Sequence, residues 1–117
     1  MVRPVWILTA LLVVSALHGF AGAAAAKDEI LHGYLMPFKC RNDDKTSHSR
    51  TCALRGECMI TGYGLAVEND EFVQFDQESN RMAIRLLRRT AKETNLRAVA
   101  HGSRSGPLFH VTVLRLE

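Results

Sequence analysis

The stretch Cys40–Cys58, CRNDDKTSHSRTCALRGEC, contains all three cysteines of the chain, with His48 between them. Residues 41–49 are rich in aspartate, asparagine and serine, a composition that predicts a surface loop. A serine near the end of this loop, Ser47 or Ser49, can cap a short helix that carries the second cysteine. We therefore expect a loop and a short helix to gather the cysteines, with the rest of the chain forming a small scaffold around them.

The cysteines of this stretch have two main interpretations, a metal site and a disulfide, and the sequence leaves both open. Three thiolates and one imidazole, from Cys40, His48, Cys52 and Cys58, are the ligand set of a closed tetrahedral zinc site. An exported chain also lies where thiols oxidise, and three cysteines cannot all pair within one molecule. The second reading is one disulfide plus a free cysteine, with Cys40–Cys58 favoured over Cys52–Cys58, and closure of that loop contributes on the order of 3 kcal/mol.

A third use of the cysteines is a reactive thiol. An imidazolium at His48 would lower the pKa of an unpaired cysteine and favour redox or nucleophilic chemistry. The sequence shows no third orienting residue and no oxyanion element, so the chain is expected not to be an enzyme.

The N-terminal segment, residues 1–26, has the pattern of a signal peptide. The apolar run Val5–Leu17 follows Arg3 and leads to Ala24–Ala26, which form an A-x-A cleavage site. The run is too short for a spanning helix of about 20 residues. We therefore predict a secreted or periplasmic protein with one domain at residues 27–117 and no transmembrane segment in the mature chain.

Charge gives little support to binding of nucleic acid. The chain has 15 Lys and Arg against 12 Asp and Glu, a formal net charge of +3 at pH 7. Loss of Arg3 with the signal peptide reduces this excess further. An exported chain with so small an excess and no interleaved exposed aromatics is not expected to bind nucleic acid.

Hydrophobic periodicity predicts five strands and two helices in the order β-α-β-β-α-β-β. Gly33 marks a bulge or bend in the first strand, and the second and third strands form a hairpin at the centre of the sheet. The expected strands cover Glu29–Phe38, Tyr63–Val67, Glu71–Phe75, Leu96–Ala100 and Leu108–Leu116, with a turn-rich connection at residues 102–107. Strands this short should curl into a small, partly open barrel resembling an OB-fold, and a flat antiparallel sheet with the second helix on one face is the alternative.

The second helix, predicted at Ser79–Lys92, is amphipathic. Apolar residues recur at helical spacing on one side, and the opposite side is basic. This basic side consists of Arg81, Arg85, Arg88, Arg89 and Lys92. It is either a solvated helix face or a binding surface for an anionic envelope lipid, polysaccharide or acidic partner.

The segment HSRTCALRGECMITGYGL, residues 48–65, resembles the C…H…C-A-L-x-x-x-C-x-x-x-G-Y-G segment of small, secreted bacterial proteins of uncharacterised function. The resemblance extends over essentially all of residues 27–117 and implies an export signal and a compact, mainly β domain, but no activity. The sequence departs from the usual pattern at Arg55–Gly56, which puts a continuous helix in doubt, and in the longer polar turn that contains Arg104. Carried over by position, the matching cysteines and histidine are Cys40, His48, Cys52 and Cys58.

These observations lead to an expected function and two alternatives. We expect an exported binding or structural module clasped by the Cys/His cluster, with or without a bound metal such as zinc. The alternatives are a thiol-based redox protein and a binder of anionic envelope components through the basic helix. The ligand itself is not predicted.

Overall fold

The computed structural model describes residues 27–117, so the predicted signal peptide lies outside the described residues. The chain is mainly β, and its elements follow the predicted order, with the first helix divided in two. In chain order they are β1 (Asp28–Pro37), the 3-10 turn η1 (Phe38–Cys40), α1 (Arg50–Ala53), α2 (Gly56–Thr61), β2 (Tyr63–Ala66), β3 (Phe72–Gln74), α3 (Gln77–Arg89), β4 (Arg97–Ser105) and β5 (Leu108–Leu116).

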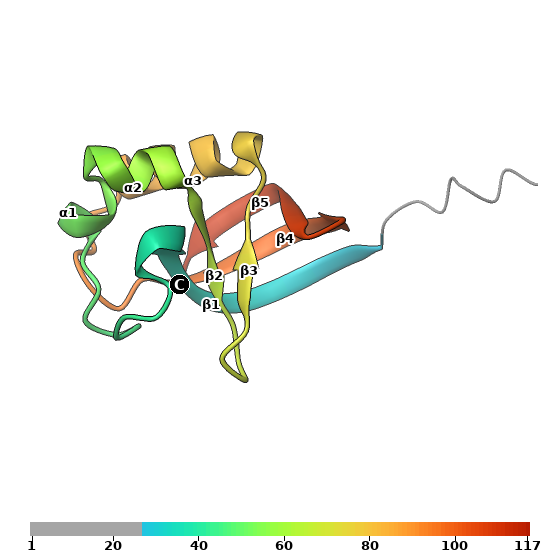
Figure 1. Ribbon diagram of the computed structural model, residues 1–117, viewed down its shortest axis with the longest axis horizontal. Coiled ribbons are helices and arrows are strands. Elements are labelled where there is room, and N and C mark those ends of the chain that lie inside the picture. Colours follow the sequence, from blue (N-terminus) through green and yellow to red (C-terminus); the bar gives the residue numbers. More distant parts are fainter. Residues whose placement is uncertain (1–26) are drawn as a thin grey trace, which may run out of the picture.

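The five strands form one antiparallel sheet in the order β3-β2-β1-β4-β5 (Figure 1). We predicted the β2–β3 hairpin at the centre of the sheet, which is wrong, because β1 occupies the centre. At 10 residues, β1 is long enough to pair with two neighbours in succession. Its first part pairs with β4, from Asp28 opposite Ser103, and its last part pairs with β2, up to Pro37 opposite Tyr63.

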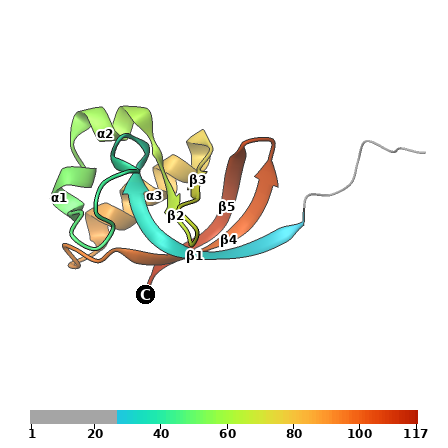
Figure 2. The same cartoon turned by 60° about the horizontal axis from the view of Figure 1, so that its bottom comes forward.

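Strand β1 changes partner at Tyr34, which lies opposite both Arg97 of β4 and Ala66 of β2, one residue after Gly33, where we predicted a bulge or bend. A Cβ atom at Gly33 would lie 2.5 Å from the carbonyl oxygen of Ala66. Only glycine therefore allows the backbone of β2 to approach so closely. Figure 2 shows β1 bending along its length, so the sheet that it centres is strongly curved rather than flat.

The two edge strands of the curved sheet approach each other at one point. Phe75, just after β3, forms a parallel bridge with Phe109 of β5, and the backbone N–H of Asp76 donates to the Phe109 carbonyl at 3.0 Å. Beyond this point, residues 27–117 contain no hydrogen-bonded ladder between β3 and β5. The mainly β fold is therefore confirmed, whereas closure into a barrel is not found.

Polar side chains accept hydrogen bonds from backbone N–H groups at both ends of helix α3. Asp76 caps its first turn by accepting a hydrogen bond from the Ser79 N–H at 2.9 Å. The predicted end at Lys92 is wrong, because Thr90 is extended and its hydroxyl accepts from the Lys92 N–H at 3.1 Å. Within residues 27–117, no helix is long and apolar enough to cross a membrane.

The last two strands form a longer hairpin than the sequence predicted. Strand β4 continues through residues 102–105, so the expected loop shrinks to a tight turn at Gly106 and Pro107. The physical reason is the register: Arg104 lies opposite Phe109, whose side chain is fully buried and fixes β5 against the core.

The hydrophobic core lies between the curved sheet and α3. Its largest fully buried side chains come from three strands, from α3 and from the segments beside β3 and β4. They include Leu35, Tyr63, Leu65, Phe75, Leu87, Leu96, Phe109 and Val111.

Candidate metal centre

The first part of the site is a turn that follows β1. Pro37 ends the strand, η1 carries Cys40 at its last position, and the Asp43 N–H donates to the Cys40 carbonyl at 2.9 Å. This hydrogen bond spans three residues and folds the chain back on itself. The side chains of Cys40 and Asp43 consequently reach the same small region.

His48 completes a three-residue cluster with this turn. One ligand atom from each of Cys40, Asp43 and His48 lies within 4.8 Å of the other two. Asp43 is exposed, Cys40 is partly buried and His48 is buried. A thiolate, a carboxylate and an imidazole at this spacing could hold a metal ion.

The imidazole of His48 is buried without a hydrogen-bond partner. Its side chain is 7% exposed, and neither Nδ1 nor Nε2 makes a hydrogen bond. Buried polar atoms are almost always paired, and leaving one unpaired costs about 1–3 kcal/mol. Burial lowers the pKa of His48, against the opposing charge of Asp43, so the ring is held neutral. Neutral imidazole is the form that binds metals.

The thiol of Cys40 and that of its neighbour Cys58 are held in their protonated form. Burial, reinforced by the charge of Cys58, raises the pKa of Cys40 to about 11. Burial also raises the pKa of Cys58, although a hydrogen bond with Cys40 acts in the opposite direction. A reactive cysteine needs a lowered pKa, so neither thiol has the electrostatic environment of a nucleophile. The charge of Lys39 also acts to lower the pKa of Cys58, but burial outweighs it.

The predicted ligand set is only partly gathered by the fold. Cys40 and His48 lie in the cluster, Cys58 adjoins Cys40, and Cys52 lies outside the three-residue group. All three cysteines are free thiols, so the favoured Cys40–Cys58 disulfide is not formed in this structure.

Sequence reasoning missed Asp43 as a candidate ligand. The zinc set expected from the sequence contains only cysteine and histidine, but the chain also has the spacing C-x-x-D, from Cys40 to Asp43. Residues three apart meet across a single turn, so this spacing was the available signal.

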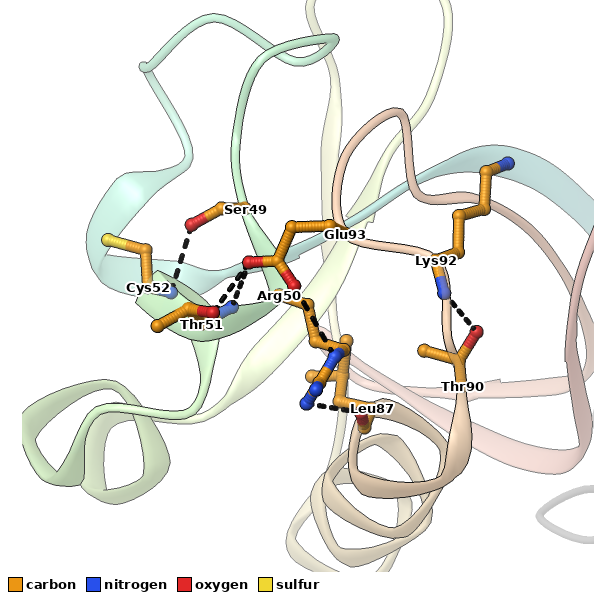
Figure 3. A network of polar contacts seen from close by, with 8 residues as sticks. All are labelled: Ser49, Arg50, Thr51, Cys52, Leu87, Thr90, Lys92 and Glu93. Atoms are coloured by element: carbon orange, nitrogen blue, oxygen red, sulfur yellow. Dashed lines mark hydrogen bonds and ion pairs between the residues drawn. The ribbon is translucent and has the colours of Figure 1, made fainter.

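Helix α1, which carries Cys52, is fixed by the segment that follows α3 (Figure 3). The Ser49 hydroxyl caps the helix by accepting from the Cys52 N–H at 3.0 Å, which confirms the predicted serine cap. Glu93 binds the same turn twice: its carbonyl accepts from the Arg50 N–H at 2.7 Å and its carboxylate from the Thr51 N–H at 3.1 Å. These bonds satisfy free N–H groups at the start of a very short helix.

The remaining sides of the cysteine stretch are also attached to the scaffold. The Asn95 N–H donates to the Thr46 carbonyl at 3.0 Å and holds the polar loop. The buried Tyr63 hydroxyl donates to the Ala53 carbonyl at the end of α1, at 2.6 Å, and burial raises the pKa of Tyr63 to about 12. The break between α1 and α2 falls at Leu54 and Arg55, and α2 begins at Gly56, so the helix is interrupted beside the Arg55–Gly56 pair where the sequence put a continuous helix in doubt.

The predicted basic side chains of α3 are gathered on the exposed side of the helix, with one exception. Lys92 lies beyond the helix end, and its ammonium donates to the carbonyl of Glu117 at 3.2 Å. The other four are exposed and lie on the helix: Arg81, Arg85, Arg88 and Arg89.

Comparisons with protein-family models, with curated proteins and with solved structures found no match to this chain.

Proposed function

We propose that this chain is an exported binding or structural module that holds a zinc ion at Cys40, Asp43 and His48, with Cys58 as the fourth donor. The observation that carries the proposal is His48, a neutral, buried imidazole whose two nitrogens have no hydrogen-bond partner beside a thiol and a carboxylate. A metal–nitrogen bond gives one of these two nitrogens a partner and removes that part of the cost of burial.

The donor set favours zinc over the common hard cations. Calcium and magnesium bind oxygen ligands almost exclusively, whereas this cluster offers sulfur and nitrogen as well as oxygen. Thiolate, imidazole and carboxylate together are typical zinc ligands. Because the Cys40 thiol has a raised pKa, zinc binding must release its proton and is therefore pH-dependent.

The raised pKa values argue against the alternative function of a reactive thiol. A redox or nucleophilic cysteine is stabilised as thiolate by a neighbouring cation or a helix N-terminus. Burial dominates at both Cys40 and Cys58 and favours the neutral thiol. We therefore expect the thiols of Cys40 and Cys58 to lose their protons only when a metal binds.

The same proposal includes export and an OB-type barrel. Export is supported by the signal-peptide pattern of residues 1–26 and by the resemblance to small secreted proteins.

The barrel is supported by the strand order β3-β2-β1-β4-β5, by a helix between β3 and β4, and by the bridge between Phe75 and Phe109. If the edge strands β3 and β5 stay joined at this bridge, hydrogen exchange at the Asp76 N–H is as slow as at the amides of the central strand. Fast exchange at Asp76 argues for an open sheet.

The experiment that tests zinc binding is native mass spectrometry of the protein recovered from an export-competent host. We expect one zinc-sized mass increment that is lost on denaturation, after which three thiols react with iodoacetamide. A mass two hydrogens short, with one alkylatable thiol, indicates a disulfide and overturns the proposal.

Matched serine variants test the ligand set. Cys40→Ser is expected to lose zinc and Cys58→Ser to weaken binding, whereas Cys52→Ser keeps it, because Cys58 hydrogen-bonds with Cys40 and Cys52 does not. Loss of zinc in Cys52→Ser, with full retention in Asp43→Asn, replaces the proposed set with the three-cysteine set.

A further inference from the structure

Within residues 27–117 some basic side chains form ion pairs and others do not, and the second kind includes the arginines of α3 as well as Arg41, Arg55 and Arg115. Away from α3, five of them form ion pairs with carboxylates at distances from 2.7 to 3.8 Å. These five are Lys39, Lys45, Arg50, Arg97 and Arg104. None of the four arginines of α3 makes such a pair with any residue of the described chain.

The uncompensated arginines form a line along the exposed side of α3. Arg81, Arg85 and Arg88 are spaced four and three residues apart, so they lie on one face of the helix. The first two make no side-chain hydrogen bond within residues 27–117, and Arg88 contacts only the Met59 sulfur, at 3.8 Å. We call Arg81, Arg85 and Arg88 the arginine row.

The surface at the arginine row is shallow and open. The three arginines and the half-buried Ile84 line a hollow with no carboxylate on its walls. A small anion bound there would stay largely hydrated, because nothing encloses it. A broad anionic surface can instead contact all three guanidinium groups at once.

We propose that the arginine row docks on the surface of a phospholipid bilayer that contains anionic lipid. Guanidinium groups bind phosphate oxygens through paired hydrogen bonds and are weakly hydrated, which suits them to a headgroup layer. The apolar side of α3 is already buried in the core, through Ala83 and Leu87. The helix therefore adsorbs by charge without inserting, and the association weakens as salt is added.

Vesicle sedimentation tests this docking with the protein as recovered after export. Vesicles of phosphatidylcholine alone are compared with vesicles that also contain phosphatidylglycerol. We expect partitioning to the anionic vesicles only, and Arg85→Glu to lower it about fivefold or more, since one basic residue near such a surface contributes about this factor. Adding Arg81→Glu should abolish it.

Arg115→Glu is the matched control, because Arg115 is an exposed arginine on β5 and the substitution changes the net charge equally. It should leave partitioning close to that of the wild type, and thermal unfolding checks that each variant is folded. Equal losses in Arg85→Glu and Arg115→Glu overturn the proposal. So does binding to an acidic polysaccharide column without binding to anionic vesicles.

Discussion

Two histidines of this protein lie near an aspartate and have opposite hydrogen-bonding states. His110 on β5 is half exposed, and its Nδ1 lies 2.7 Å from the Asp76 carboxylate at the start of α3. His48 is buried beside Asp43 and Cys40, and neither of its ring nitrogens is hydrogen-bonded. The first imidazole is partly exposed and has a carboxylate partner, whereas the second has two buried polar atoms without a partner.

The comparison separates a structural pair from a candidate ligand. Asp76 accepts from the Ser79 N–H and contacts His110, so its carboxylate serves the helix cap. Asp43 is exposed, and its neighbours are a thiol and a buried ring. Proximity of histidine and aspartate is therefore not the signal of a metal site. The signal is a buried imidazole without a partner, next to a thiol that burial keeps protonated.

The largest expected effect is on zinc affinity when each histidine is removed. His48→Ala should lower it by about 100-fold or more, since loss of an outer-shell partner alone costs about 10 to 100-fold. His110→Ala should leave it unchanged. Competition with a chromogenic chelator measures both variants, and equal effects would remove the distinction between the two histidines.

The next effect concerns the two adjacent aspartates of the polar loop. Asp43→Asn should weaken zinc binding by roughly 10-fold or more, because the amide oxygen is a poorer ligand than a carboxylate. Asp44 accepts from the N–H and the hydroxyl of Thr46, each at 2.9 Å, and serves the loop turn. Asp44→Asn is therefore the matched control and should retain wild-type affinity in the same titration. If Asp44→Asn is the weaker binder, Asp43 is not a ligand.

A smaller effect is expected on stability at the other aspartate. Asp76→Ala removes the cap of α3 and should lower the free energy of unfolding by about 1 kcal/mol. Urea denaturation measures the change, with Glu78→Ala in the first turn of the same helix as control. Zinc affinity of Asp76→Ala should equal that of the wild type, because the cap is not part of the cluster.

The smallest effect is the pH dependence of unfolding in the zinc-free protein. Burial lowers the pKa of His48 below its ordinary 6.5, so the unfolded chain takes up its proton first and stability falls as the pH drops below about 6.5. The pKa of Asp76 is also lowered from 3.8, because hydrogen bonds from Ser79 and His110 outweigh the opposing effect of burial. Stability from this carboxylate is therefore present above pH 3.8 and lost below it.

Urea midpoints measured between pH 8 and pH 3 check this order. His48→Gln should remove the loss that begins near pH 6.5, and Asp76→Asn should remove the loss below pH 3.8. A zinc-free protein with the same midpoint at pH 7.5 and pH 5.5 would contradict the neutral, buried state of His48.

Local patterns predicted the elements of the fold well. The cap at Ser49, the interruption of the helix before Gly56 and the hairpin of β2 and β3 all depend on neighbours in sequence. The end of α3 was placed too late, because the apolar period continues to Ala91 while the Thr90 hydroxyl takes the Lys92 N–H. The length of β4 was underestimated, because burial of Phe109, and not the turn-rich composition opposite it, fixes that register.

Spacing along the chain is enough to predict the set of strands and helices, the concentration of thiols between Cys40 and Cys58, and the basic side of α3. The central place of β1 arises only when the chain folds, since Gly33 allows β2 to approach beside Tyr34, where the strand changes partner. Folding also brings the donors of the metal cluster together. Burial of His48 and the turn from Cys40 to Asp43 depend on how the loop is held against the sheet, and spacing along the chain does not contain that information.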